Sequence, residues 1–203
     1  MQDDEALKTL IARIALGNSA AMAEFYTLWF GQFVCLAARQ TGNPDAAEDI
    51  AQDTVIQVIT RAGTYIPGRG ASPRAWMLTI LHNRVCDWAR RKEVRRAQSV
   101  NVPSEDDESG HRAIDIPARE PSAEERLSER ERDGAMRAAL AKLTETEREV
   151  ILLRDYSGLS APQTASTLGI SVEKVGSRLF RARKRLGALL QTDWPGLFPS
   201  HDL

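Results

Sequence analysis

The chain has 203 residues, of which 42% are hydrophobic and 27% are charged, and its formal net charge at pH 7 is −1. This composition excludes a wholly disordered chain and suffices for one or two small hydrophobic cores. No apolar run approaches the roughly 18 residues of a membrane span, and Met1–Glu5 is not the basic start of a signal peptide. The sequence therefore predicts a cytoplasmic protein.

The near-zero net charge conceals an uneven distribution along the chain. Residues 61–97 carry nine basic and two acidic side chains, and residues 171–203 carry six and three. Residues 98–131, between these blocks, carry four basic and ten acidic side chains. Because salt screens charges over about 8 to 10 Å, each block acts locally. Both basic blocks are therefore candidate surfaces for a polyanion such as nucleic acid.

The first 62 residues show helical periodicity. Apolar spacing predicts helices over 3–16, 19–40 and 44–62, separated by Gly17-Asn18 and by Gly42-Asn43-Pro44. The third helix also carries a strip of acidic and polar side chains opposite its apolar face. The strip consists of Asp45, Glu48, Asp49, Gln52 and Asp53. Such a strip is usually only a solvated face, and a binding site for a partner is the alternative.

A loop and a long basic helix follow. Two prolines and two glycines within residues 65–73 exclude regular structure there. Helical spacing resumes over 73–96, where Trp76 and Trp88 occur among arginines. Aromatic rings beside cations suit unpaired bases, because the rings stack on bases while the cations hold the backbone. A place in the hydrophobic core is an equally good interpretation of each tryptophan.

The second half of the chain predicts a linker and a smaller helical domain. Residues 98–131 are acidic and rich in proline, which is typical of a flexible linker. A helix is expected over 133–142, and Thr144 with Glu147 forms a capping box for another. The sequence thus predicts an all-α protein with two small helical domains. The domain boundaries are 1–97 for the first domain, 98–131 for the linker, 132–192 for the second domain and 193–203 for a tail.

The end of the second domain predicts a helix-turn-helix. Ser160 and Gln163 form a capping box, Gly169 suits a left-handed C-cap, and Ser171 suits the N-cap of an Arg-rich helix reaching Leu186. In a helix-turn-helix the second helix enters the major groove of DNA. The helix carries a basic stripe that we expect to face outward, formed by Lys174, Arg178, Arg181 and Arg185. An ordinary solvated charged helix is the alternative.

Several motifs, in this order, resemble the bacterial sigma factors of RNA polymerase. They are 44–53 (PDAAEDIAQD), Trp76 through Asn83-Arg84, Asp87 to Arg90-Arg91, 147–154 (EREVILLR), and Gly169-Ile170-Ser171 to 177–183 (SRLFRAR). The two-domain spacing is similar to the extracytoplasmic-function (ECF) type within the sigma-70 superfamily. The chain departs from the usual family pattern at Ala161-Pro162-Gln163 and at Glu173-Lys174-Val175-Gly176.

The resemblance implies a sigma factor that binds core RNA polymerase and directs promoter-specific initiation. The acidic helix would bind the beta-prime clamp through Asp45, Glu48, Asp49, Gln52 and Asp53, and the beta flap is a further implied contact. The implied residues for the minus-ten element are Tyr65, Arg69, Ser72, Trp76, Asn83, Arg84, Asp87, Trp88, Arg90 and Arg91. Those for the minus-thirty-five element are Ser171, Glu173, Lys174, Ser177, Arg178, Arg181 and Arg185. An anti-sigma factor is an expected partner, and membrane insertion is not expected.

Two other interpretations stay open at this point. One is a stand-alone helix-turn-helix regulator that binds duplex DNA without polymerase, and the other is a mimic that titrates the inhibitor of a sigma factor. Cys35 and Cys86 lack metal or redox spacing and are expected to be free thiols. His82 lies four residues from Cys86, but two ligands are too few for a structural zinc site. We expect no enzyme, catalytic residue, cofactor or metal.

Overall fold

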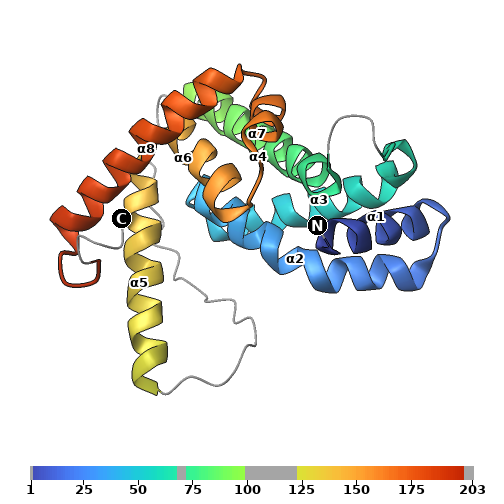
Figure 1. Cartoon of the computed structure of the whole chain (residues 1–203), viewed down its shortest axis with the longest axis horizontal. Coiled ribbons are helices and arrows are strands. Elements are labelled where there is room, and N and C mark those ends of the chain that lie inside the picture. The colour runs from blue at the N-terminus through green and yellow to red at the C-terminus, as the bar shows by residue number, and fades with distance from the viewer. Residues whose placement is uncertain (1, 68–71, 99–122, 199–203) are drawn as a thin grey trace. The chain divides into compact units, whose positions relative to one another are not determined.

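The computed structural model describes residues 2–67, 72–98 and 123–198, and the regular structure in these ranges is helical (Figure 1). The chain divides into two compact units, Met1–Arg112 and Ala113–Leu203. Each unit has its own set of buried apolar side chains. The predicted all-α protein with two helical parts is confirmed, while residues 99–122 of the predicted linker lie outside the described residues.

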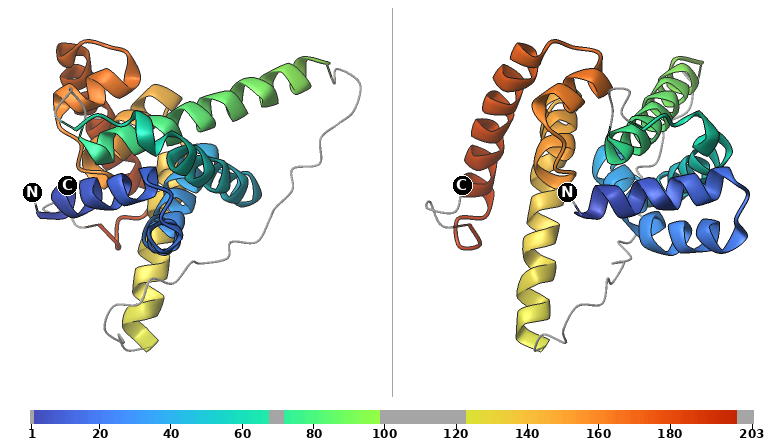
Figure 2. Two further views of the ribbon diagram at one scale, coloured as in Figure 1. Left: turned by 90° about the vertical axis from the view of Figure 1, so that its right-hand side faces the viewer. Right: turned by 45° about the vertical axis from the view of Figure 1, so that its right-hand side comes forward.

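Four long helices make up most of the described residues of the first unit. They are α1 (Gln2–Ala15), α2 (Ser19–Thr41), α3 (Pro44–Arg61) and α4 (Pro73–Gln98), with a 3₁₀ turn at Ala62–Thr64 after α3. Helices α1 and α2 lie side by side and run antiparallel (Figures 1 and 2). Phe25 and Phe33 of α2, together with Met77 and Leu81 of α4, are among the largest fully buried side chains. Burial of these apolar groups is the main stabilising contribution to the unit.

Local sequence signals set the helix boundaries of this unit. The Asn18 side chain accepts a hydrogen bond from the Ala21 amide at 2.9 Å, which caps α2. Gly42 ends α2 with a φ of 65°, a conformation that costs glycine little. Asn43 then caps α3 by accepting from the Ala46 amide at 2.9 Å, with Pro44 in the first turn. The predicted breaks between these helices are confirmed.

The described part of the second unit contains four helices and one irregular turn. They are α5 (Ala123–Ala141), α6 (Glu145–Ile151), a π-helical turn η2 (Leu152–Tyr156), α7 (Ala161–Leu168) and α8 (Val172–Asp193). Helix α8 packs against α5, α6 and α7, and the right-hand view of Figure 2 shows it running beside α5. The buried cluster of the unit consists of Leu140, Leu143, Val150, Ile151, Leu152, Ala165, Val175 and Ala182. The core therefore draws on every helix of the unit.

Two helices of this unit are longer than the sequence predicted. Helix α5 begins at Ala123 rather than at 133, so residues 123–131 of the predicted linker are helical. The segment is composed mainly of Ala, Glu, Arg and Leu, which have high helix propensity. Helix α8 continues past Leu186 to Asp193, because Leu190 supplies one more buried apolar position.

Candidate nucleic-acid and protein interfaces

The acidic strip of α3 is fully accessible. Asp45, Glu48, Asp49, Gln52 and Asp53 are all exposed, and none of the four carboxylates forms an ion pair with a described residue. The opposite face of α3 is buried through Ala47, Ile50, Ala51, Val55 and Val58. Ile56, one turn beyond Gln52, is 58% exposed and adds an apolar side chain to the strip. Ile56 lies outside the apolar period of α3, and this position could have indicated its exposure, but Ile56 was not among the predicted contact residues.

The loop before α4 places an aromatic pair beside the helix start. The rings of Tyr65 and Trp76 lie 5.3 Å apart between centroids at an interplanar angle of 43°, and both residues are half-buried. Ser72 accepts a hydrogen bond from the Ala75 amide at 3.2 Å, so its hydroxyl fixes the first turn of α4. Arg69 lies outside the described residues. Tyr65, Ser72 and Trp76 are therefore grouped at one end of α4.

The basic part of α4 is organised around one carboxylate. Asp87 contacts Arg84 at 3.1 Å and Arg90 at 3.1 Å, and its backbone carbonyl accepts from Arg91 Nε at 3.2 Å. Asn83 is exposed on the same part of the helix. Asp87 thus holds neighbouring guanidinium groups in fixed positions along α4. A hollow of about 470 Å³ is lined by Arg84, Asp87, Arg90, Arg91, Val94 and Arg95.

The tryptophans of α4 are only half-buried. Trp88 has the Lys92 ammonium 5.0 Å from its ring centroid, a cation–π contact on its own helix. Trp76 contacts Tyr65 as described above. Neither ring is enclosed in the core in the way that Phe25 and Phe33 are. Partial exposure keeps both rings compatible with contact to a base.

The turn between α7 and α8 is fixed by its caps. The Ser160 amide donates to Gln163 Oε1 at 2.7 Å and the Gln163 amide donates to Ser160 Oγ at 3.4 Å, which completes the predicted capping box. Gly169 has a φ of 63° and ends α7. Ser171 Oγ accepts from the Lys174 amide at 3.3 Å and starts α8. The predicted helix-turn-helix is confirmed, with Pro162 in the first turn of α7.

The surface of α8 differs from the predicted arrangement of its basic stripe. Lys174, Arg181 and Arg185 are exposed, but Arg178 is half-buried. Val175 and Ala182 are buried against the core. The side of α8 that faces away from them carries Glu173, Ser177, Phe180 and Lys184, and the basic stripe lies on the flank toward α6. The expectation that all four basic residues face outward was wrong for Arg178, because that position lies close to the buried stripe.

Two cations of α8 are paired with acids of the same unit. Arg185 Nη1 lies 3.3 Å from Glu147 Oε2 on α6. Arg183 contacts Asp155 of η2 through two hydrogen bonds, at 3.0 and 2.5 Å, and this pairing raises the pKa of Arg183. Lys174, Arg181 and Lys184 form no ion pair with a described residue. These three side chains are therefore the ones most readily available to phosphate groups.

Glu147 connects the α6 cap to the recognition helix. Its carboxylate accepts from the Thr144 amide at 3.0 Å and from the Thr144 hydroxyl at 2.8 Å, in addition to its contact with Arg185. Burial alone would raise the pKa of Glu147, but the Thr144 hydrogen bonds and the charges of Arg185 and Arg181 hold it below its ordinary value of 4.5. The ionised form is thus favoured in the folded unit.

Some residues that position the helix-turn-helix were not predicted. Arg148 Nε donates to the Leu140 carbonyl at 2.8 Å, and Arg148 Nη2 donates to the carbonyls of Ala141 and Leu143 at 3.0 and 3.1 Å. These carbonyls lie at the C-terminal end of α5 and just beyond it, and that of Leu140 also accepts from the Leu143 amide at 3.2 Å. Phe180, 71% exposed on α8, was also missed. Phe180 is a large apolar side chain that lies outside the apolar period of an Arg-rich helix, and this position could have indicated its exposure.

The comparisons with known proteins agree with this geometry. Residues 29–95 match the family model of sigma-70 region 2, and residues 133–186 match that of sigma-70 region 4. The chain is 31% identical over 194 residues to the RNA polymerase sigma factor CnrH of Cupriavidus metallidurans, an alignment covering 95% of this chain and 98% of CnrH. It is 33% identical over 158 residues to the ECF RNA polymerase sigma factor EcfG of Rhodopseudomonas palustris, covering 75% of this chain and 76% of that protein.

Solved structures of sigma factors are also similar to this chain. A structure of CnrH in complex with the cytosolic domain of CnrY shares 28% identity, with a TM-score of 0.59, and covers 93% of this chain and 99% of the other. The sigma factor RpoE of Bartonella quintana, solved with the anti-sigma factor NepR, shares 26% identity with this chain, with a TM-score of 0.61. The alignment covers 84% of this chain and 97% of RpoE. The chain belongs to the ECF sigma factors of bacterial RNA polymerase.

Membership of this family defines the function of the chain. It is an initiation factor that binds core RNA polymerase and directs transcription from specific promoters, with minus-ten and minus-thirty-five elements as its DNA targets. Sigma factors are regulators that act on RNA polymerase inside the cell. No helix within residues 2–67, 72–98 and 123–198 is both long and apolar enough to cross a membrane.

Proposed function

We propose that the two units divide the work of promoter recognition. In this proposal the first domain, 1–97, binds core polymerase and the minus-ten element. The second domain, 132–192, binds the minus-thirty-five element, and the segment between them is the linker. The matched regions 29–95 and 133–186 fall on the two units in that order, which supports this division. The helical stretch 123–131 extends the second domain toward its N-terminus.

The polymerase contact is assigned to the acidic strip of α3. We propose that Asp45, Glu48, Asp49, Gln52 and Asp53 bind the beta-prime clamp. The observation that carries this proposal is that these side chains are exposed on one face without ion pairs to described residues. Ile56 in the strip supplies an apolar anchor, and interfaces commonly combine such an anchor with a charged rim. The beta flap is a further proposed contact on core polymerase.

The minus-ten contact is assigned to α4 and the loop before it. The residues proposed are Tyr65, Arg69, Ser72, Trp76, Asn83, Arg84, Asp87, Trp88, Arg90 and Arg91. Half-buried rings at Tyr65, Trp76 and Trp88 suit stacking on bases of a melted strand. The guanidinium groups ordered by Asp87 suit its phosphates. Single-strand contacts of this kind offset the few kcal/mol lost for each base that leaves the duplex, so melting requires no catalytic step by this chain.

The minus-thirty-five contact is assigned to α8, from its N-cap Ser171 to Arg185. The residues proposed are Ser171, Glu173, Lys174, Ser177, Arg178, Arg181 and Arg185. Of these, Lys174 and Arg181 are exposed and unpaired with acids, which favours them as phosphate contacts. We add Phe180, because an exposed apolar side chain on a recognition helix suits contact with a thymine methyl group.

An anti-sigma factor is the proposed regulator of the chain. The similar protein CnrH was solved with the cytosolic domain of CnrY, and the similar RpoE was solved with the anti-sigma factor NepR. We propose a partner of the same class here and a cytoplasmic location for the chain. A stand-alone regulator that binds duplex DNA without polymerase is not favoured by the family membership.

Promoter-specific transcription by purified core RNA polymerase, with and without the chain, tests this proposal. Fragments of the source genome serve as templates. We expect defined transcripts only when the chain is present, with shared sequences upstream of their start sites. If the chain binds duplex fragments but never associates with core polymerase, the acidic strip is only a solvated face and the assignment of α3 fails.

A further inference from the structure

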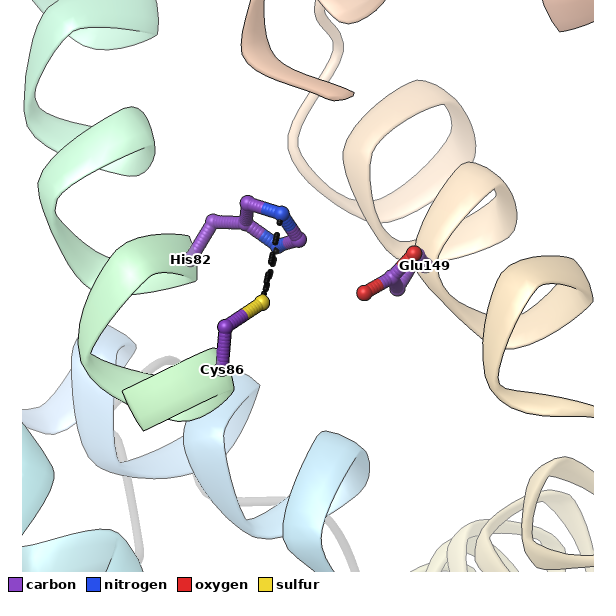
Figure 3. Close-up of side chains that lie close together, drawn as sticks. All are labelled: His82, Cys86 and Glu149. Carbon is purple, nitrogen blue, oxygen red and sulfur yellow. Dashed lines mark hydrogen bonds between the residues drawn. The ribbon is translucent and has the colours of Figure 1, made fainter. Parts of the chain in front are cut away.

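A cysteine and a histidine lie one turn apart on α4 and contact each other. The Sγ atom of Cys86 is 3.5 Å from Nε2 and 4.0 Å from Nδ1 of His82 (Figure 3). Neither residue belongs to the proposed contacts with polymerase or promoter DNA. We propose that His82 and Cys86 form an open, exchangeable site for a borderline-soft divalent metal ion, with Zn²⁺ as the natural ligand.

The distance between the two ligand atoms fits one tetrahedral zinc ion. Zinc–sulfur bonds are about 2.3 Å long and zinc–nitrogen bonds about 2.0 to 2.1 Å. At a tetrahedral angle, sulfur and nitrogen atoms bound to the same ion are therefore about 3.6 Å apart. The observed 3.5 Å between Cys86 Sγ and His82 Nε2 matches this separation. Because Sγ also lies 4.0 Å from Nδ1, it sits beside the ring, and metal binding requires the imidazole to turn on its own side chain so that the Nε2 lone pair points at the ion, while the backbone of α4 stays in place.

The sequence spacing and the donor atoms select the class of metal. Residues four apart on a helix lie on one face, and pairs of histidines at this spacing bind zinc in helical metalloprotease motifs. A thiolate with an imidazole suits zinc and cobalt, whereas magnesium and calcium prefer oxygen donors. The site is therefore selective by donor type.

Two protein ligands define an open site, in contrast to a structural one. Structural zinc sites use four protein ligands, so here water molecules complete the coordination sphere. Binding converts the Cys86 thiol into a thiolate, replaces metal–water bonds of the ion with one sulfur–metal and one nitrogen–metal bond, and releases the displaced waters and one proton to solvent. No electron is transferred. The ion exchanges readily because half of its coordination sphere is solvent.

The chain provides a matched control cysteine. Cys35 lies on α2 of the same unit, and the residues four positions before and after it are Gly31 and Arg39. Neither of these can act as a second ligand. Cys35→Ser therefore removes a thiol without removing a ligand pair.

Titration of the reduced, chelator-treated full chain with Co²⁺ tests the site, because a cobalt–thiolate bond gives a near-ultraviolet charge-transfer absorption. We expect the band to saturate at one equivalent, to be absent in Cys86→Ser, and to persist unchanged in Cys35→Ser. In His82→Asn we expect binding at least about tenfold weaker, which is about 1.4 kcal/mol. Competition with Zn²⁺ should abolish the band, and circular dichroism confirms that each variant remains helical.

The opposite results overturn the proposal. These are no band in the unmodified chain, a band that survives Cys86→Ser, a band lost in Cys35→Ser, or an affinity that His82→Asn leaves unchanged in a folded variant. The test does not involve polymerase or DNA, so its outcome is independent of the proposed promoter contacts.

Discussion

The acidic strip of α3 and the basic flank of α8 present their charges in different ways. The carboxylates of the strip have no ion pairs with described residues, whereas Arg183 and Arg185 of α8 are paired with Asp155 and Glu147. The carboxylates of the strip are therefore available to bind a basic partner, whereas part of the positive charge on α8 is already neutralised by acids of its own unit. A count of charges in the sequence therefore overstates the number of α8 cations that are available to DNA. The same count gives the correct number of available carboxylates in the acidic strip.

The largest effect is expected from reversing charge in the strip. Asp49→Lys combined with Asp53→Lys should weaken binding to core polymerase by about 2 kcal/mol or more, roughly 30-fold, because like charges then face the basic partner. Binding is measured by fluorescence anisotropy of the labelled chain. Glu24→Lys is the control, since Glu24 is exposed on α2 and, among the described residues, pairs only with Arg13, a surface ion pair of small energy. An equal loss in the control contradicts a specific role for the strip.

The next largest effect is a difference in DNA affinity between variants at paired and unpaired cations of α8. Arg181→Ala should weaken binding to a duplex carrying the minus-thirty-five element by about tenfold and reduce its salt dependence by about one phosphate contact. Arg183→Ala should change DNA affinity less, because that guanidinium is held by Asp155. Equilibrium titrations at several salt concentrations measure both. A larger loss in Arg183→Ala shows that the ion pair with Asp155 opens on DNA.

A smaller effect concerns the cap that links α6 to α8. Glu147→Ala should lower the free energy of unfolding of the second unit by about 1 kcal/mol at pH 7, because it removes the capping-box acceptor and the contact with Arg185. Because the folded pKa of Glu147 lies below 4.5, this contribution is present above pH 4.5 and is lost as the pH falls through the folded pKa. Calorimetry of the full chain at pH 7 and at acid pH measures the difference. If the difference in the free energy of unfolding between the variant and the unmodified chain is as large at acid pH as at pH 7, the ionised carboxylate does not have this role.

The smallest effect involves a glycine inside α8. Gly176 is exposed, and a Cβ built on it meets nothing within 4 Å. Gly176→Ala should stabilise the helix by about 1 kcal/mol with little change in DNA affinity. Gly176→Lys should also raise duplex affinity several-fold and steepen its salt dependence by about one phosphate contact. If both variants bind DNA equally well, the added charge does not reach a phosphate and this side of α8 faces away from DNA.

Much of the fold could be predicted because its signals are local. Asn18, Gly42, Ser160 and Gly169 act on the backbone within a few residues of their own positions, so the sequence alone places the helix ends there. The acidic strip was equally predictable, since the period of a helix determines which residues share a face.

The arginine contacts that were missed depend on packing between helices, unlike the exposed Ile56 and Phe180, whose own helical period signals them. Arg148 binds carbonyls at the end of α5, and Arg183 binds Asp155 of η2, a partner 28 positions away in sequence. Nothing in the sequence near either arginine distinguishes it from a cation available to DNA. The same limit explains Arg178, whose half-burial follows from the way α8 packs on the core.

The most direct test of the division of labour measures both activities on the same two variants. Binding to core polymerase and binding to a minus-thirty-five duplex are determined for the Asp49→Lys, Asp53→Lys double variant and for Arg181→Ala. We predict that the first variant loses polymerase binding and keeps duplex binding, and that the second shows the reverse. Loss of duplex binding in the α3 variant with polymerase binding intact would contradict the account.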